Sequence, residues 1–225
     1  MRINYKFLII LVVLLTLSIT VSVFAYNNTR FPGDLWLAQG IQSINNDFLT
    51  SMMEYISFIF DTWGSFIIVV VLGLLFWWRA GWRESVLIVT GGILAATSSL
   101  LKMIIDRPRP SPDLVIVFSQ EDTSSFPSGH SFFVFIVLGL SAYLTVTRIR
   151  SKTLKIVILA ILVALVLLTG LSRIYLGAHW PSDIAGGYLT GGIFLIILIW
   201  IDKVWISRHH NVPEPIQPEP HPDIV

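Results

Sequence analysis

The chain has 225 residues, of which 54% are hydrophobic and only 13% are charged, a composition more apolar than that of ordinary soluble domains. Its formal net charge is +1, which provides no concentrated basic surface for a nucleic acid. Because the sequence contains no cysteine, disulfides, thiolate metal sites and a cysteine nucleophile are excluded. We therefore expect an all-α, polytopic membrane helix bundle with no nucleic-acid partner.

Six stretches reach or approach the roughly 20 apolar residues that a helix needs to cross a bilayer. The second is short, but it ends in Trp77 and Trp78, and tryptophan favours the membrane–water interface. Together the six form one predicted domain, residues 1–210. The predicted spans are 6–25, 62–78, 84–105, 129–147, 154–171 and 184–202.

Lysine and arginine set the predicted direction of these spans, since short cytoplasmic loops carry an excess of both. With the N-terminus inside, ten of the fifteen basic residues fall on the inner side. We expect both termini to be cytoplasmic, most simply at a bacterial plasma membrane. A competing interpretation is signal-peptide cleavage after "VSVFA", which ends at Ala25; it would remove the first span and leave the others unchanged.

Two segments lie outside the spans. Residues 27–61 contain "DLWLAQGIQSINNDFL", whose apolar residues have roughly helical spacing. This outer segment is expected either to lie on the membrane surface or to be a loop packed over the helix bundle. Residues 211–225 carry five prolines, which predicts a disordered cytoplasmic tail.

Charged residues gather where the third predicted span ends, in "LKMIIDRPRP". Lys102 lies within an apolar span, where an ammonium group needs a partner or a functional reason. Arg107 and Arg109 alternate with prolines, so their backbone is extended or turned. Taken alone, Lys102 is as well explained by snorkelling to the headgroups, and the arginines by headgroup binding.

The fourth predicted span opens with "PSGH", residues 127–130. A helix N-terminus offers free N–H groups and the positive end of its dipole, which suits a phosphate. Ser128 and Gly129 stand at this position and His130 follows. Simple N-capping by Ser128 is the alternative, and it does not account for His130.

The connection "SRIYLGAHWPSD" joins the fifth and sixth spans at 172–183. His179 and Asp183 are four residues apart, and Pro181 indicates that a helix begins between them. This spacing lets Asp183 accept a hydrogen bond from one ring nitrogen of His179 and leaves the other nitrogen as a nucleophile or base; a structural histidine–carboxylate pair is the alternative. Arg173 supplies a planar fork that binds two oxygens of an anion.

By the predicted topology, all three stretches lie on the outer side. They bring cations, a helix N-terminus, an oriented histidine and a second histidine to one face. Phosphoryl transfer uses this combination, because it needs positive groups for the oxygens that gain charge, a nucleophile and a proton donor for the leaving oxygen.

The three stretches together resemble the signature of the type 2 phosphatidic acid phosphatase (PAP2) superfamily. The six-span form is similar to bacterial membrane phosphatases of the phosphatidylglycerophosphate phosphatase B kind. The motifs occupy about 80 residues and match in order and spacing. They are Lys102, six residues, then Arg109-Pro110; Pro127-Ser128-Gly129-His130; and Ser172-Arg173, five residues, His179, three residues, Asp183.

The resemblance implies a role for each matching residue. His179 would attack phosphorus and become a phosphohistidine, Asp183 would orient it, and His130 would protonate the leaving oxygen. The resemblance also implies that no metal or other cofactor is needed. The implied phosphate-binding residues are Lys102, Arg109, Ser128, Gly129 and Arg173, with Arg107 and Ser172 as auxiliary residues.

The expected substrate is a lipid whose phosphate reaches the outer face while its tails stay in the bilayer. Phosphatidylglycerophosphate and undecaprenyl pyrophosphate are the main candidates, followed by phosphatidic acid. A lipid-phosphate binder or transporter that performs no hydrolysis is the alternative. Vanadate-dependent oxidation, which the superfamily also includes, is disfavoured because those relatives are soluble.

Overall fold

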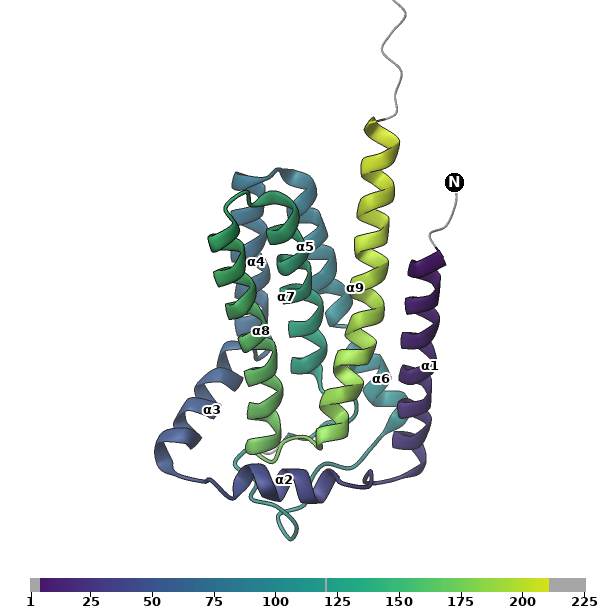
Figure 1. The fold of residues 1–225 in the computed structure, drawn as a ribbon. Coiled ribbons are helices and arrows are strands. Elements are labelled where there is room, and N and C mark those ends of the chain that lie inside the picture. The colour runs from purple at the N-terminus through teal and green to yellow at the C-terminus, as the bar shows by residue number, and fades with distance from the viewer. Residues whose placement is uncertain (1–4, 120, 211–225) are drawn as a thin grey trace, which may run out of the picture.

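The computed structural model describes residues 5–119 and 121–210, with side chains up to residue 206. Within these residues, six helical segments are long and apolar enough to cross a membrane, as the sequence predicts. All regular elements in the described part are helices (Figure 1). They are α1 (Tyr5–Asn27), α2 (Asp34–Gln42), α3 (Asp47–Ile59), α4 (Thr62–Arg79), α5 (Trp82–Ala95), α6 (Ser98–Ile105), α7 (Gly129–Arg148), α8 (Lys152–Tyr175) and α9 (Pro181–His210).

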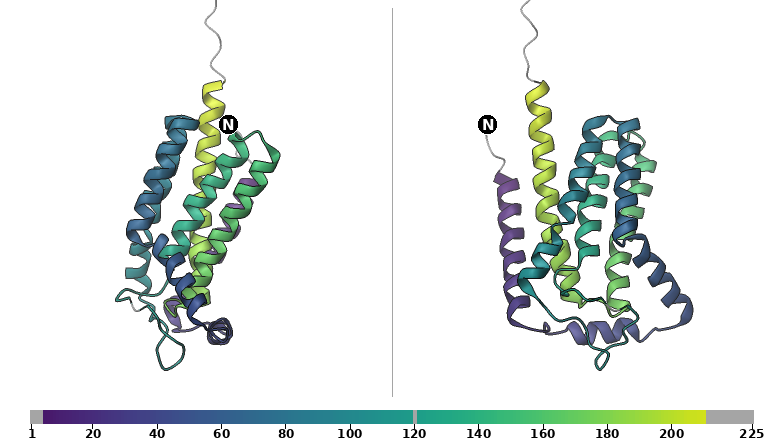
Figure 2. Two further views of the ribbon diagram at one scale, coloured as in Figure 1. Left: turned by 90° about the vertical axis from the view of Figure 1, so that its left-hand side faces the viewer. Right: turned by 180° about the vertical axis from the view of Figure 1, so that it is seen from behind.

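Helix α7 forms the centre of the bundle and packs against α5, α8 and α9 (Figure 2). Its side chains Phe132, Val134, Ile136 and Leu140 are fully buried. By contrast, α1, α4 and α8 expose many large apolar side chains, as expected where a bundle faces lipid tails rather than water. The helix that carries the "PSGH" stretch is therefore also the most enclosed one.

The third predicted span differs from the prediction, because it consists of two helices. Residues 84–105 were expected to be one helix, but α5 ends at Ala95 and α6 begins at Ser98. At the break, the Thr97 hydroxyl donates a 2.6 Å hydrogen bond to the carbonyl of Leu94. Such local side-chain bonds compete with the regular helical pattern, and the third span is divided into α5 and α6 at this point.

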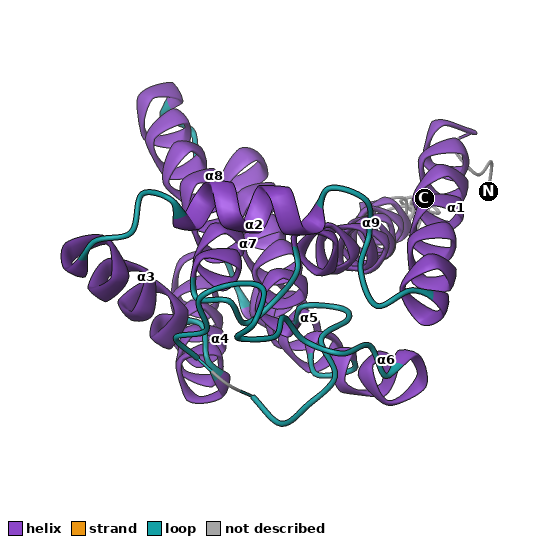
Figure 3. Cartoon of the chain, turned by 90° about the horizontal axis from the view of Figure 1, so that it is seen from below, coloured by secondary structure: helices purple, strands orange, loops and turns teal. Residues whose placement is uncertain are grey.

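Helix α2 packs over the bundle, so this part of the outer segment has the position of the second alternative but is a helix rather than a loop. Its Leu35, Ala38 and Ile41 contact a cluster that includes Trp180 and Ile184. Figure 3 shows α2 crossing the ends of the spanning helices. Helix α3 then leads along α8 to α4.

The two ends of the bundle differ in what they carry. The beginning of α1 and the end of α9 lie at the end remote from α2 (Figure 1), whereas the loop between α6 and α7 lies beside α2 (Figure 3). We name these the termini end and the site end. The predicted proline-rich tail, residues 211–225, lies outside the described residues.

Candidate active site

The beginnings of α7 and α9 approach each other closely at the site end. The Ser128 N–H donates a 3.1 Å hydrogen bond to the carbonyl of Asp183. A Cβ atom on Gly187 would lie 2.8 Å from the Ser128 carbonyl oxygen, so a glycine is required where the two helices meet. This approach places the 125–130 stretch beside the 179–183 stretch.

The start of α9 uses Asp183 as a capping residue. Pro181 is the first helical residue, as the sequence predicts, and the Trp180 N–H donates a 2.8 Å hydrogen bond to Asp183 Oδ2. This is the reciprocal half of a capping box. Ser125 Oγ donates to the same oxygen, so Asp183 is held from two sides.

His179 lies against Asp183 without a direct hydrogen bond. Its Nδ1 is 3.6 Å from Asp183 Oδ2, longer than a hydrogen bond between these atoms. Within the described residues this buried Nδ1 has no hydrogen-bond partner. The two groups of the expected pair are therefore adjacent but not hydrogen-bonded; catalytic contacts often tighten only in the complex with substrate.

The other nitrogen of His179 faces the cations. Arg109 Nη1 is 3.3 Å from His179 Nε2 and donates to the carbonyl of Ala178 at 2.6 Å. Burial, followed by the charges of Arg109 and Arg173, holds the pKa of His179 well below its usual value. Its imidazole is therefore neutral at pH 7, and a neutral imidazole can act as a nucleophile.

Arg109 and Arg173 converge on one carboxylate, that of Glu121. Arg109 Nη2 donates to Glu121 Oε2 at 2.7 Å, and Arg173 Nη2 donates to Glu121 Oε1. Arg173 Nη1 also donates to Ser57 Oγ, while its buried Nε has no partner among the described residues. The two guanidinium groups thus form a cradle, in which another anion can take the position of the Glu121 carboxylate.

Lys102 and His130 approach the same region from α6 and α7. Lys102 Nζ donates to Thr123 Oγ1 at 3.3 Å, and His130 Nε2 is buried with no partner within the described chain. Ser128 is fully buried and its Oγ caps α7 by accepting from the Ser131 N–H at 3.4 Å. A contact between Ser128 or Gly129 and a phosphate remains a prediction.

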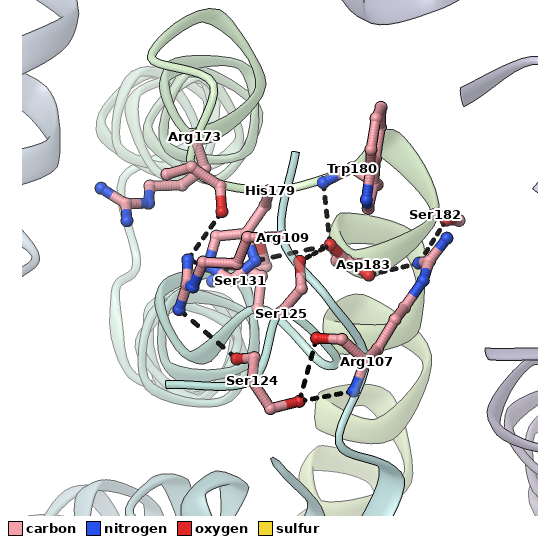
Figure 4. A network of polar contacts seen from close by, with 12 residues as sticks. Arg107, Arg109, Ser124, Ser125, Ser131, Arg173, His179, Trp180, Ser182 and Asp183 are labelled. Carbon is pink, nitrogen blue, oxygen red and sulfur yellow. Dashed lines mark hydrogen bonds and ion pairs between the residues drawn. The ribbon is translucent and has the colours of Figure 1, made fainter. Parts of the chain in front are cut away.

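Arg107 and Ser172, the predicted auxiliary residues, point elsewhere. Arg107 is 1% exposed; its Nη1 donates to Asp183 Oδ1 (Figure 4), and its Nη2 donates to Asp34 Oδ2 at 2.9 Å. Ser172 Oγ donates to the carbonyl of Thr169 within α8. The structure favours Arg107 as a support for Asp183 over a direct phosphate contact, because its guanidinium is enclosed by protein groups.

A cavity of about 940 Å³ opens beside these residues. Apolar side chains of α4, α5 and α7, including Val69, Ile93 and Phe133, line one part, and Lys102 and His130 line another. The cavity thus joins an apolar space between helices to the polar end of the site.

Positive charge at the site comes from side chains. Within the described part of the chain, no three His, Asp or Glu side chains are grouped as a metal site would require. Lys102, Arg109 and Arg173 instead supply three cations. Such groups can stabilise the equatorial oxygens of a phosphoryl group, which is otherwise a common task of a metal ion.

Sequence reasoning missed three residues of this site. Glu121, Ser125 and Asp34 belong to no recognised motif, and their partners are distant in the chain. The only available signal was an acidic residue, Glu121, in a loop flanked by conspicuous cations. Asp34 offered none, because the outer helix that carries it had no predicted link to the site.

The profile of the PAP2 superfamily matches residues 83–207, more than half of the chain. The chain belongs to the PAP2 superfamily. This confirms the resemblance inferred from the three motifs, all of which lie within the matched region.

Matches to individual relatives cover about 40 to 60% of this chain. Over 141 residues the chain is 28% identical to phosphatidylglycerophosphatase B of Bacillus subtilis (strain 168), a match covering 60% of this chain and 66% of that protein. It is 33% identical over 93 residues to the "Putative undecaprenyl-diphosphatase YbjG" of Escherichia coli (strain K12), covering 41% of each. The chain therefore spans just under two thirds of the length of the first relative and about two fifths of the length of the second.

Two crystal structures share the fold. The transmembrane PAP2-type phosphatidylglycerolphosphate phosphatase of Bacillus subtilis aligns with a TM-score of 0.73 and 23% identity, covering 86% of this chain and 96% of that one. LpxE of Aquifex aeolicus aligns with a TM-score of 0.58 and 23% identity, covering 76% and 96%. These matches confirm the predicted membrane-helix architecture of the superfamily.

Proposed function

We propose that this protein is a lipid phosphatase that removes the terminal phosphate of phosphatidylglycerophosphate, undecaprenyl pyrophosphate or both, with phosphatidic acid as a further candidate. The observation that carries the proposal is the cavity of about 940 Å³ whose wall changes from apolar helix faces to Lys102 and His130. A lipid phosphate has the same two parts, since its tails need an apolar space and its phosphate needs cations.

The proposed reaction starts at His179. Its neutral Nε2 forms a bond to phosphorus while the bond from phosphorus to the leaving oxygen breaks, and His130 donates a proton to that oxygen. Water then attacks phosphorus and gives a proton to His130, the bond between phosphorus and His179 Nε2 breaks, and phosphate leaves. Arg109 and Arg173 would hold the equatorial oxygens as they gain negative charge.

Asp183 would orient the nucleophile during these steps. When His179 Nε2 bonds to phosphorus, the imidazole ring gains positive charge. Its Nδ1–H would then approach the Asp183 carboxylate and form a hydrogen bond. Arg107 would keep this carboxylate in place through its buried ion pair with Asp183. We place the reaction at the outer face of a bacterial plasma membrane, with both termini cytoplasmic, on the basis of the lysine and arginine distribution.

The test is phosphate release by the purified, detergent-solubilised protein in the presence of a chelator. The rates of phosphate release from phosphatidylglycerophosphate, undecaprenyl pyrophosphate and phosphatidic acid are measured for the wild type and for His179→Ala. We expect release that the variant loses, and the ranking of rates would identify the preferred lipid. Absence of release from all three would instead favour a lipid-phosphate binder or transporter, and activity that returns only with a divalent ion would contradict the metal-independent chemistry.

A further inference from the structure

Ser57, near the end of α3, contacts two residues of the candidate active site. Its Oγ accepts a hydrogen bond from Arg173 Nη1 on α8, and its backbone is hydrogen-bonded to the ring of His130 on α7. Ser57 is buried and belongs to none of the three motifs. It also lies outside residues 83–207, the range that the superfamily profile matches, so the family resemblance assigns it no role.

Helix α3 holds Ser57 against the end of α8 (Figure 1). One turn before Ser57, Met53 packs in a cluster with Tyr175. A further turn back, Thr50 Oγ1 lies 2.9 Å from the Tyr175 hydroxyl, within hydrogen-bond distance. These three residues lie on one face of α3, and Tyr175 is two residues from Arg173. Helix packing therefore fixes the position of Ser57 relative to Arg173.

The Ser57 hydroxyl is suited to orient Arg173 when a phosphate is bound. Within the described residues, the Arg173 guanidinium donates to two acceptors, Ser57 and Glu121. When a phosphate takes the position of the Glu121 carboxylate, Ser57 is the acceptor that remains and fixes the plane of the guanidinium. Because a hydroxyl is neutral, it orients this group without cancelling the charge that the phosphate needs.

The backbone contact determines which nitrogen of His130 can exchange a proton. His130 Nε2 has no partner among the described residues, so the nitrogen that bonds to Ser57 is Nδ1. Ser57 is in the last turn of α3, where N–H groups are bonded within the helix and carbonyl groups lack a regular helical partner. A carbonyl only accepts hydrogen bonds. Nδ1 therefore keeps its proton, and Nε2 is left to give and take one.

We propose that Ser57 is a positioning residue that holds the phosphate-binding Arg173 and the proton-transferring His130 in register with each other. The proposal rests on the proposed function, which assigns those two roles. In the first step His130 Nε2 gives its proton to the leaving oxygen, and in the second step it takes one from water. Nδ1–H stays on the Ser57 carbonyl throughout. Arg173 and His130 belong to different helices, and Ser57 contacts both.

A purely structural role for Ser57 gives a different expectation. If the hydroxyl only satisfies a buried guanidinium, its removal should lower the stability of the protein and leave the rate per folded molecule unchanged. If the hydroxyl positions Arg173, the rate should fall even when the unfolding temperature equals that of the wild type.

The experiment compares three substitutions of Ser57 by phosphate release from the lipids above, orthophosphate binding by calorimetry in detergent, and thermal unfolding. Ser57→Ala removes the acceptor, Ser57→Cys keeps a similar shape with a weak acceptor, and Ser57→Thr restores a hydroxyl. We expect the Ala and Cys variants to release phosphate about tenfold more slowly and to bind orthophosphate more weakly, as for loss of a hydrogen bond to a charged group. We expect the Thr variant to recover most of the rate. Ser51→Ala is the matched control, because Ser51 is exposed on the same helix, and it should change nothing.

A double variant tests whether Ser57 acts through Arg173. Arg173→Lys replaces the planar fork with a single ammonium group, which a hydroxyl cannot orient in the same way. The change Ser57→Ala should therefore slow the wild type about tenfold and have little further effect on Arg173→Lys. Equal losses in both backgrounds would mean that Ser57 does not act through Arg173.

Imidazole nitrogen NMR tests the contact with His130 and requires no turnover. His130→Gln assigns the signal in protein with labelled histidine. We expect the neutral His130 ring to carry its proton on Nδ1, since the Ser57 carbonyl accepts from that nitrogen. A neutral ring with its proton on Nε2 would refute this part of the proposal.

The remaining outcomes also decide for or against the proposal. A wild-type rate for Ser57→Cys, rates that fall only in step with stability, or no binding of orthophosphate to the wild type would overturn it. If Ser57→Ala does not fold, Ser57→Cys and Ser57→Thr supply the comparison. Absence of lipid hydrolysis by the wild type would overturn the proposed function, whereas orthophosphate binding and the His130 tautomer would still test the role of Ser57. The two failures are therefore distinguishable.

Discussion

Both ends of the helix bundle bury charged side chains, but they balance the charges differently. At the termini end, Arg83 pairs with Asp202 and Arg148 pairs with Glu84. The Tyr143 hydroxyl completes this cluster by donating a 2.8 Å hydrogen bond to Asp202. Each of these two cations has a carboxylate of its own, and the pairs connect α5 with α9 and α7.

At the site end, Arg107 is paired with Asp34 and Asp183, but Lys102, Arg109 and Arg173 gather near one other carboxylate, that of Glu121. Buried ring nitrogens of His130 and His179 have no hydrogen-bond partner among the described residues. Unsatisfied buried polar groups are costly and are retained where they have a function. Matched charges hold helices together, whereas three cations around one carboxylate, beside imidazole nitrogens that lack a partner within the described residues, indicate a place for an anion.

Removing the proposed nucleophile should have the largest effect at the site end. His179→Ala is expected to lower the rate of phosphate release by at least about a thousandfold, because the covalent intermediate can no longer form. It should also eliminate acid-labile radiolabel trapped on the protein from a phosphate-labelled lipid.

His130→Ala distinguishes the two histidines. This variant should release phosphate slowly yet still trap label when the leaving group is already a good one, since His130 acts on the leaving oxygen and on water. Trapping that persists in His179→Ala and disappears in His130→Ala would reverse the two assignments.

The buried support of Asp183 should have the next largest effect. Arg107→Gln and Asp34→Asn interrupt the chain of contacts from α2 through Arg107 to Asp183, and we expect a loss of about 10- to 100-fold in kcat, as for groups that orient a functional side chain. Because neither residue contacts the phosphate in our proposal, KM should change less than kcat.

The double variant Arg107→Gln/Asp34→Asn provides the check. If both residues act through Asp183, the double loss should be smaller than the product of the single losses. Full multiplicativity would mean that Asp34 and Arg107 act independently.

Much of this architecture follows from local features of the sequence. Long apolar runs predict the spanning helices because a bilayer leaves the backbone few other conformations, and Pro181 and Ser128 mark the starts of α9 and α7. The break at Thr97 was not predictable, since serine and threonine side chains also bond to the backbone inside unbroken helices, as Ser141 and Thr169 do.

The site was predictable only in part, for a related reason. Lys102, Arg109, His130, Arg173 and His179 have a recognisable spacing and do gather at one end of the bundle. Glu121 and Asp34 instead act through partners that are distant in the chain, and no spacing rule links them. The direction in which Arg107 points also depends on Asp34, so its buried position could not be read from the "RPRP" stretch.

Burial and the neighbouring arginines should determine how the charge of His179, and its contribution to folding stability, depend on pH. Since burial and the neighbouring arginines lower the pKa of His179, its ring should remain neutral well below pH 6.5. The unfolded chain protonates this histidine near pH 6.5, so its contribution to folding stability should decrease as the pH falls below that value. Imidazole nitrogen NMR of protein with labelled histidine, with His179→Gln to assign the signal, measures both tautomer and charge; protonation of His179 near pH 6.5 would show that the cations do not act on it as described.

Breaking a matched pair at the termini end should have the smallest effect on the reaction. Arg148→Gln leaves the buried Glu84 carboxylate without its partner. Since Arg148 is 44% exposed and Glu84 is buried, we expect a loss of about 2 kcal/mol in stability, between the values for exposed and buried pairs. The rate of phosphate release should remain within about twofold of the wild type, since the pair lies at the opposite end of the bundle. Thermal unfolding and phosphate release measured on the same preparation provide both values. A large loss of rate without loss of stability would mean that the two ends are coupled through α7. The ion pairs at the termini end would then contribute to catalysis as well as to the packing of the helices.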